Sequence, residues 1–102
     1  MLVAVGLFEL HIEYAQSLKE KRMVVKSLRD KLRHRFEISA SEVALHDVHQ
    51  RARLAVAFVS SDGATAEALL DKIRSFVESN TDAVLAGWTS ERLDFDEMAT
   101  LI

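Results

Sequence analysis

Basic side chains recur along one stretch of the sequence at a spacing that could bind phosphate groups. The stretch from Ser17 to Phe36 contains eight of the thirteen lysine and arginine residues and only two acids, Glu20 and Asp30, so its net charge is +6. The whole chain carries −3, which leaves −9 for everything outside this stretch. Ammonium and guanidinium groups bind phosphate oxygens through charge-assisted hydrogen bonds. A positive stretch in an otherwise negative chain predicts a surface that binds an anion.

Five of these basic residues share one side of the helix that the stretch predicts. They recur at every third or fourth position: Lys19, Arg22, Lys26, Arg29 and Arg33. The apolar residues, among them Val25 and Leu28, form a second stripe about a quarter turn away, at roughly 100° per residue. Neighbours on such a stripe lie about 5–6 Å apart, which is comparable to the spacing of phosphates along a strand. We therefore predict these five residues as RNA contacts, with Arg51 and Arg53 as additions.

The sequence leaves three partners open for this stripe. It could be solvated surface tied to the protein's own acids, such as Glu67, Asp71 or Glu78. It could track the backbone of RNA, for instance on a ribosomal particle, with salt-dependent affinity and little sequence preference. It could also meet an acidic protein, in which case the chain would be a homodimeric protein-interaction module.

The rest of the sequence predicts neither an enzyme nor a cofactor or metal site. The chain has no cysteine, which excludes disulfides, thiolate metal ligands and cysteine nucleophiles. No P-loop, dinucleotide fingerprint or nucleophile elbow occurs. His46, Asp47 and His49 form the one pattern that resembles a metal site; without a fourth ligand, we interpret it as a polar turn.

The hydrophobic pattern predicts four strands and two helices. Residues 2–13, 38–46, 51–60 and 84–93 alternate as strands do, and residues 17–36 and 62–80 have the helical period. Ser17 with Glu20 three residues later predicts a capping box at the start of the first helix, and Ser61 or Asp62 caps the second. Lys21 falls near the apolar stripe, where we expect it to extend past the end of the sheet.

The order strand–helix–strand–strand–helix–strand is that of the split βαβ plan. Right-handed crossovers place both helices on one face of a four-stranded antiparallel sheet. We predict an α+β, ferredoxin-like fold for a single domain over residues 1–102, with residues 94–102 as a C-terminal tail. The irregular alternation of the second strand predicts a bulge near Ser41 or Glu42.

One face of this sheet lies away from the helices, and part of it is apolar. Strand alternation places Val3, Val5 and Leu7 on this face, followed by the polar Glu9 and His11. Two such faces stacked together would cover these residues, so we expect a homodimer through the open sheet face. No run approaches the roughly 18 apolar residues of a membrane span, and we expect a cytoplasmic protein.

One run of the sequence is distinctive: Gln16-Ser17-Leu18-Lys19-Glu20-Lys21-Arg22, with Val25-Lys26-Ser27-Leu28 after it. This run resembles the YlxP-like family of small bacterial proteins, a domain of unknown function numbered 503. Weaker matches lie at Glu42-Val43, Asp47, Gln50-Arg51-Ala52, Val59-Ser60 and Asp62. His49 departs from the aromatic residue usual in the family, and Ser61 from its Asn. The resemblance implies a ferredoxin-like fold and, because genes of this family commonly lie among those for translation, a connection with RNA or the ribosome.

Overall fold

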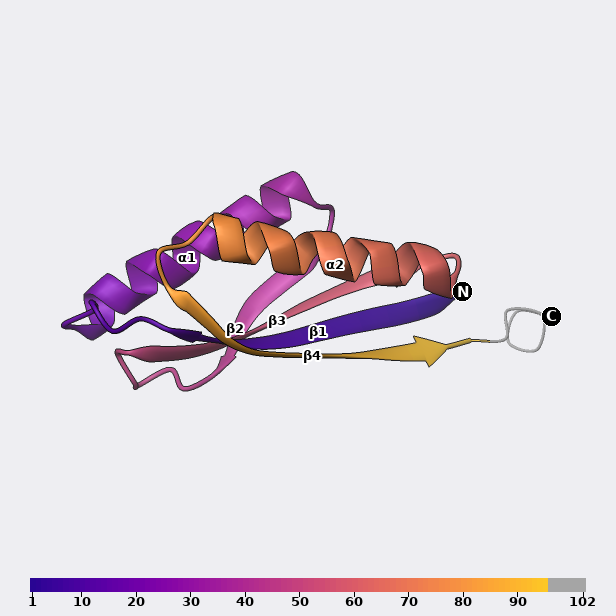
Figure 1. The fold of residues 1–102 in the computed structure, drawn as a ribbon. Coiled ribbons are helices and arrows are strands. Elements are labelled where there is room, and N and C mark those ends of the chain that lie inside the picture. The colour runs from indigo at the N-terminus through magenta and orange to yellow at the C-terminus, as the bar shows by residue number, and fades with distance from the viewer. Residues whose placement is uncertain (96–102) are drawn as a thin grey trace.

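The computed structural model describes residues 1–95 and contains six elements of secondary structure. In chain order they are β1 (Leu2–His11), α1 (Leu18–Arg35), β2 (Ser39–Ala44), β3 (Arg51–Ser60), α2 (Gly63–Ser79) and β4 (Val84–Asp94). The strands form one antiparallel sheet in the order β2-β3-β1-β4. Both helices lie on the same face of that sheet (Figure 1). The predicted ferredoxin-like α+β fold is confirmed; the predicted tail beyond Phe95 lies outside the described residues.

The start of α1 uses a variant of the predicted capping box. Ser17 Oγ accepts a hydrogen bond from the backbone N–H of Glu20 at 3.1 Å. The Glu20 carboxylate accepts one from the backbone N–H of Gln16 at 3.0 Å, one residue earlier than the usual partner. These bonds fix where the helix begins, and with it the face that Val25 and Leu28 turn toward the sheet.

Asp62, rather than Ser61, caps α2. Its carboxylate accepts hydrogen bonds from the backbone N–H of Thr65 at 2.8 Å and from the Thr65 hydroxyl at 3.0 Å. These bonds hold the pKa of Asp62 below its ordinary value, because they favour the ionised carboxylate. The helix buries Ala66, Leu70, Ile73 and Val77 against the sheet.

The core lies between the helices and the even-numbered residues of β1. Leu2, Ala4, Phe8 and Leu10 are at most 2% exposed. Trp88 joins them on the same side of the sheet, where its ring stacks on Phe8 with centroids 5.6 Å apart. Gly6 makes room for this ring, since a Cβ at position 6 would lie 3.1 Å from the Trp88 Cη2 atom.

The second strand is shorter than expected, and its bulge falls later. The pairing of β2 with β3 shifts between Glu42 and Ala44, so Val43 is the extra residue. The bulge therefore lies one residue beyond the predicted Ser41–Glu42 position. It lets Ala40 be buried while Val43 is 48% exposed.

The other face of the sheet, here called the outer face, has no described element over it (Figure 1). The exposed fractions of its apolar residues are 39% for Val5, 37% for Leu7, 68% for Val59 and 60% for Leu93. The sequence-based placement of Val3, Val5 and Leu7 on this face agrees with the register of β1. Among residues 1–95, no helix is both long and apolar enough to cross a membrane.

Candidate nucleic-acid interface

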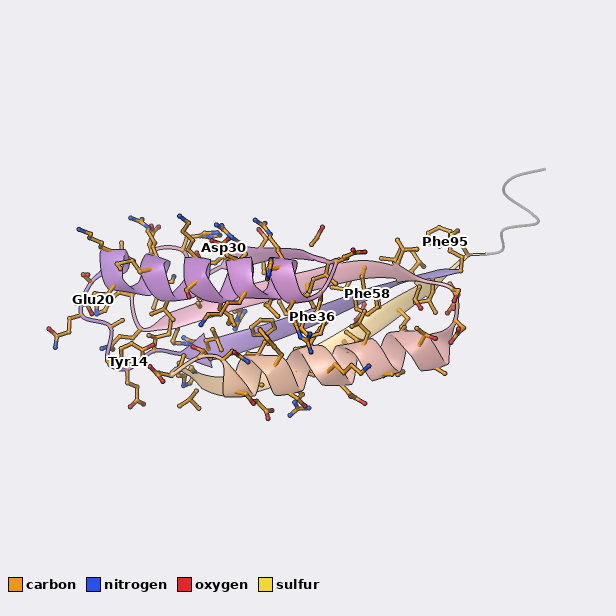
Figure 2. The ribbon with its side chains drawn as sticks, turned by 90° about the horizontal axis from the view of Figure 1, so that it is seen from above. Tyr14, Glu20, Asp30, Phe36, Phe58 and Phe95 are labelled. Carbon is orange, nitrogen blue, oxygen red and sulfur yellow. The ribbon has the colours of Figure 1, made fainter. Side chains whose placement is uncertain are left out.

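The five predicted RNA contacts lie on the flank of α1 that faces away from α2. Figure 2 shows nitrogen-tipped side chains along this flank, between the labelled Glu20 and Asp30 and beyond. We call the set the basic flank: Lys19, Arg22, Lys26, Arg29 and Arg33. It borders the edge strand β2, because α1 packs over that side of the sheet.

Three members of the basic flank are free to bind a ligand. Lys19, Arg22 and Lys26 are exposed, and none of them makes a hydrogen bond or ion pair with a residue in the range 1–95. They extend over slightly more than two helical turns at the start of α1, because they are spaced three and four residues apart. Unpaired, solvated cations on consecutive turns can accept an anion without first breaking a contact.

The other two members already have partners within the chain. Arg29 Nε lies 3.5 Å from a carboxylate oxygen of Asp30, and the Arg29 side chain is 32% exposed. Arg33 Nη2 donates a 2.6 Å hydrogen bond to the carbonyl of Ala40 in β2. Arg33 thereby ties the end of α1 to the edge strand, so binding a phosphate there would compete with this bond.

Lys21 is not at the surface, contrary to the expectation that it extends past the sheet. Its side chain is fully buried, and Nζ lies 2.7 Å from Oε2 of Glu42. The same ammonium donates hydrogen bonds to the carbonyls of Leu45 at 2.6 Å and His46 at 3.4 Å. Leu45 has a positive φ of 63°, a conformation that is uncommon outside glycine. Lys21 thus anchors the turn that follows β2.

The spacing of the sequence contains the signal for this burial. Lys21 precedes the buried Val25, Leu28 and Leu32 by four, seven and eleven positions, which is the periodicity of one helical face. Lys21 was expected near the apolar stripe for this reason, but with its ammonium group extending past the sheet rather than buried.

Arg51 and Arg53, the predicted additions, lie on the outer face and thus on the opposite side of the sheet from α1. Arg51 donates two hydrogen bonds of 3.1 Å to the Glu9 carboxylate, and Arg53 Nε donates one of 2.9 Å. His11 Nε2 lies 2.8 Å from the same carboxylate. The arginines first, and then His11, lower the pKa of Glu9 to about 2. Both arginines are therefore engaged away from the basic flank.

The residues that resemble a metal site do not gather in the structure. Within residues 1–95, no group of three histidine, aspartate, glutamate or cysteine side chains lies close enough to hold a metal ion. His46 Nε2 is 3.3 Å from the carbonyl oxygen of Glu42, in the turn that Lys21 anchors.

A shallow groove of about 500 Å³ runs between α1 and the C-terminal end of α2. It lies along the flank of α1 opposite the basic flank, and Lys31 bridges it by donating a 3.4 Å hydrogen bond to the Asn80 carbonyl. Burial, and secondarily the charge of Asp82, raise the pKa of Tyr14 at its rim. Lys31 therefore lies on the groove side of α1 and is not a member of the basic flank.

Comparison with known proteins identifies the family. The profile of the family described as "Protein of unknown function (DUF503)" matches residues 3–89. The "Uncharacterized protein YlxP" of Bacillus subtilis (strain 168) is 37% identical over 65 residues, which cover 64% of this chain and 71% of that protein. The family profile thus covers the chain from the second residue of β1 through α2 to about the middle of β4. The chain therefore belongs to the DUF503 family of proteins of unknown function.

Proposed function

We propose that this protein binds the phosphate backbone of RNA through the basic flank of α1, and that this contact attaches it to a ribosomal particle in the cytoplasm. It acts in this proposal as a binding protein without catalytic activity. The observation that carries the proposal is the free state of Lys19, Arg22 and Lys26, which are exposed and lack a hydrogen bond or ion pair to the described part of the chain.

The charge distribution favours a local contact over wrapping by RNA. The stretch from Ser17 to Phe36 carries +6 and the remaining chain −9, so a polyanion is attracted to one side of the molecule and repelled elsewhere. Contacts to phosphates release counterions, which makes such binding weaken as salt rises. We expect modest affinity, little sequence preference and a footprint of a few phosphates.

The sheet makes no contribution to RNA binding in this proposal. RNA-recognition modules of similar topology stack bases on aromatic side chains of their central strands. The described outer-face positions of the central strands β1 and β3 hold aliphatic, small and charged residues and no Phe, Tyr or Trp, and their one histidine, His11, contacts Glu9. Arg51 and Arg53 are bound to Glu9 there.

The test compares two double charge reversals of equal size. Arg22→Glu with Lys26→Glu alters the basic flank, whereas Lys72→Glu with Arg74→Glu alters exposed residues of α2. Each is titrated with labelled ribosomal RNA fragments at two salt concentrations. We expect the first variant to lose most of its affinity at both salts and the second to retain it. Equal affinity in the two variants would refute the basic flank as the RNA surface.

An acidic protein is the alternative partner for the basic flank, and ribonuclease treatment distinguishes it from RNA. Capture of the wild-type protein with ribosomal particles from lysate should disappear after ribonuclease treatment if RNA is the partner. Partners that survive ribonuclease but are lost in the Arg22→Glu, Lys26→Glu variant would instead assign the flank to an acidic protein.

A further inference from the structure

The outer face changes from apolar to charged along the strands. Its residues form rows, each made of one residue of β1 and the residue opposite it on β3. Val3 pairs with Val59, Val5 with Ala57 and Leu7 with Ala55, which makes three aliphatic rows. The next row pairs Glu9 with Arg53 and is charged. Across β1 and β3 the face is thus apolar at one end and ionic at the other, and β4 adds the exposed Glu91 beside Val5.

In two of the three aliphatic rows the large side chain lies on β1 and the small one on β3, whereas the Val3–Val59 row has a valine on both strands. Val5 and Leu7 project from β1 as a ridge, while Ala55 and Ala57 leave a trough over the neighbouring β3. A ridge beside a trough of matching length is complementary to itself. Rotation by 180° about an axis between the two strands brings the ridge of one copy over the trough of another.

We propose that two copies of this chain stack outer face to outer face about a two-fold axis parallel to the strands, between β1 and β3. Val5 and Leu7 of each copy then fill the trough over Ala55 and Ala57 of the other. The same rotation keeps each row at its own level along the strands, and the interface is isologous because both copies contribute the same surface.

The charged row supports this axis independently of the aliphatic rows. Because Glu9 and Arg53 lie side by side on β1 and β3, the rotation places Glu9 of each copy above Arg53 of the other. An axis in the sheet plane but perpendicular to the strands would set the charged row against the aliphatic end near Val3 and Val59. Burying those charges against aliphatic side chains is costly, so the parallel axis is favoured.

The face is large enough for a stable dimer. The four strands have ten, six, ten and eleven residues; at about 4.8 Å by 3.3 Å for each residue, they give a face of about 600 Å². Two stacked faces bury about 1,200 Å², at the lower end of specific interfaces. Sheets stack about 10 Å apart with strands nearly aligned, a distance that side chains such as Glu9 and Arg53 can span.

The stacked dimer leaves both helical layers on the outside. The two basic flanks then lie on opposite sides of the assembly, since α1 covers the sheet face that is remote from the interface (Figure 1). Dimerisation itself does not rest on the proposed RNA binding, and its test requires no RNA.

The first experiment measures the association state by sedimentation equilibrium over a wide range of concentrations. We expect the wild type to be dimeric and Leu7→Glu to raise the dissociation constant at least about tenfold, since it places a carboxylate among aliphatic side chains. Met23→Glu is the matched control, because Met23 is 64% exposed on α1 and the charge change is the same. A monomeric wild type, or a Leu7→Glu variant that dimerises as tightly as the wild type, would overturn the proposal.

The second experiment tests the symmetry by exchanging charges. Glu9→Arg sets two arginines against each other across the axis, and Arg53→Glu sets two glutamates against each other, so each variant alone should be monomeric. Mixed together, the two variants regain opposite charges in both cross-axis pairs, and native mass spectrometry should detect a one-to-one heterodimer. If both variants are folded by circular dichroism and the mixture stays monomeric, the proposed axis is wrong. Each substitution also removes the contact between Glu9 and Arg53 within one chain. Only the mixing step therefore tests the contact between the two copies.

Discussion

Nζ of Lys21 lies 2.7 Å from Oε2 of Glu42, with the lysine side chain fully buried and the glutamate 15% exposed. The ammonium also donates to two carbonyls of the turn after β2. One buried charge therefore joins the first turn of α1, the end of β2 and the left-handed residue Leu45.

Replacing Lys21 should destabilise the fold. Lys21→Met retains the volume but leaves Glu42 without its counter-charge and the carbonyl of Leu45 without a donor. We expect the free energy of unfolding in urea to fall by about 3 kcal/mol. Adding Glu42→Leu should recover part of that loss, since it removes the unpaired carboxylate. Lys72→Met on the surface of α2 is the control, and should change stability by less than about 0.5 kcal/mol; an equally small effect at position 21 would contradict the anchoring role.

Stability should decline in acid partly through Glu9. The pKa of Glu9 is lowered from 4.5 to about 2 in the folded state, chiefly by Arg51 and Arg53. A depressed folded pKa stabilises the protein fully above the unfolded value, and this stabilisation is lost as pH falls from about 4.5 toward 2. Urea unfolding across this pH range should therefore show a shallower decline for Glu9→Gln than for the wild type. Parallel profiles for the two proteins would show that Glu9 does not drive the loss.

The helix cap of α2 makes a separate prediction. Asp62→Ala removes the acceptor for the Thr65 N–H and should lower the free energy of unfolding by about 1 kcal/mol. Asp62→Asn retains an acceptor oxygen and should lose much less. Thermal unfolding followed by circular dichroism compares the two; an alanine variant as stable as the asparagine variant would mean that the cap contributes little.

The members of the basic flank should differ in their contribution to RNA binding. Arg22→Gln should lower the slope of log affinity against log salt by about 0.7–0.9, the loss of one phosphate contact. Arg33→Gln should change this slope less, because Arg33 is held by the Ala40 carbonyl. Filter binding over a series of salt concentrations measures both slopes. A larger change for Arg33→Gln would indicate that Arg33 leaves β2 to bind RNA.

Hydrophobic periodicity was sufficient to predict the element order, because both helices and the strands β1 and β3 have a clear apolar stripe. Arg51–Ser60 was predicted with the observed bounds, and Ser17 was identified as the N-cap of α1. The family was likewise recognisable from the run around Ser17–Arg22, and the comparisons confirm it.

The details that escaped prediction depend on contacts between distant segments. Lys21 has the residue type of a surface position, and only the packing of Glu42 and the turn after it makes burial favourable. The bulge at Val43 depends on the register with β3. Arg51 and Arg53 were added to the predicted RNA contacts on residue type alone, whereas strand alternation places them on the outer face with Glu9.

The position of β1 in the sheet also determines when the molecule can fold during its synthesis. All ten residues of β1 pair with β3, and all ten have partners in β4 as well. β1 is therefore central, and its neighbour β4 is synthesised after all the other described elements. Such non-local pairing slows folding, and the sheet cannot be completed cotranslationally until β4 has emerged from the ribosome. Truncation before β4 should accordingly yield a nascent chain that is sensitive to proteases, with one edge of its central strand unpaired.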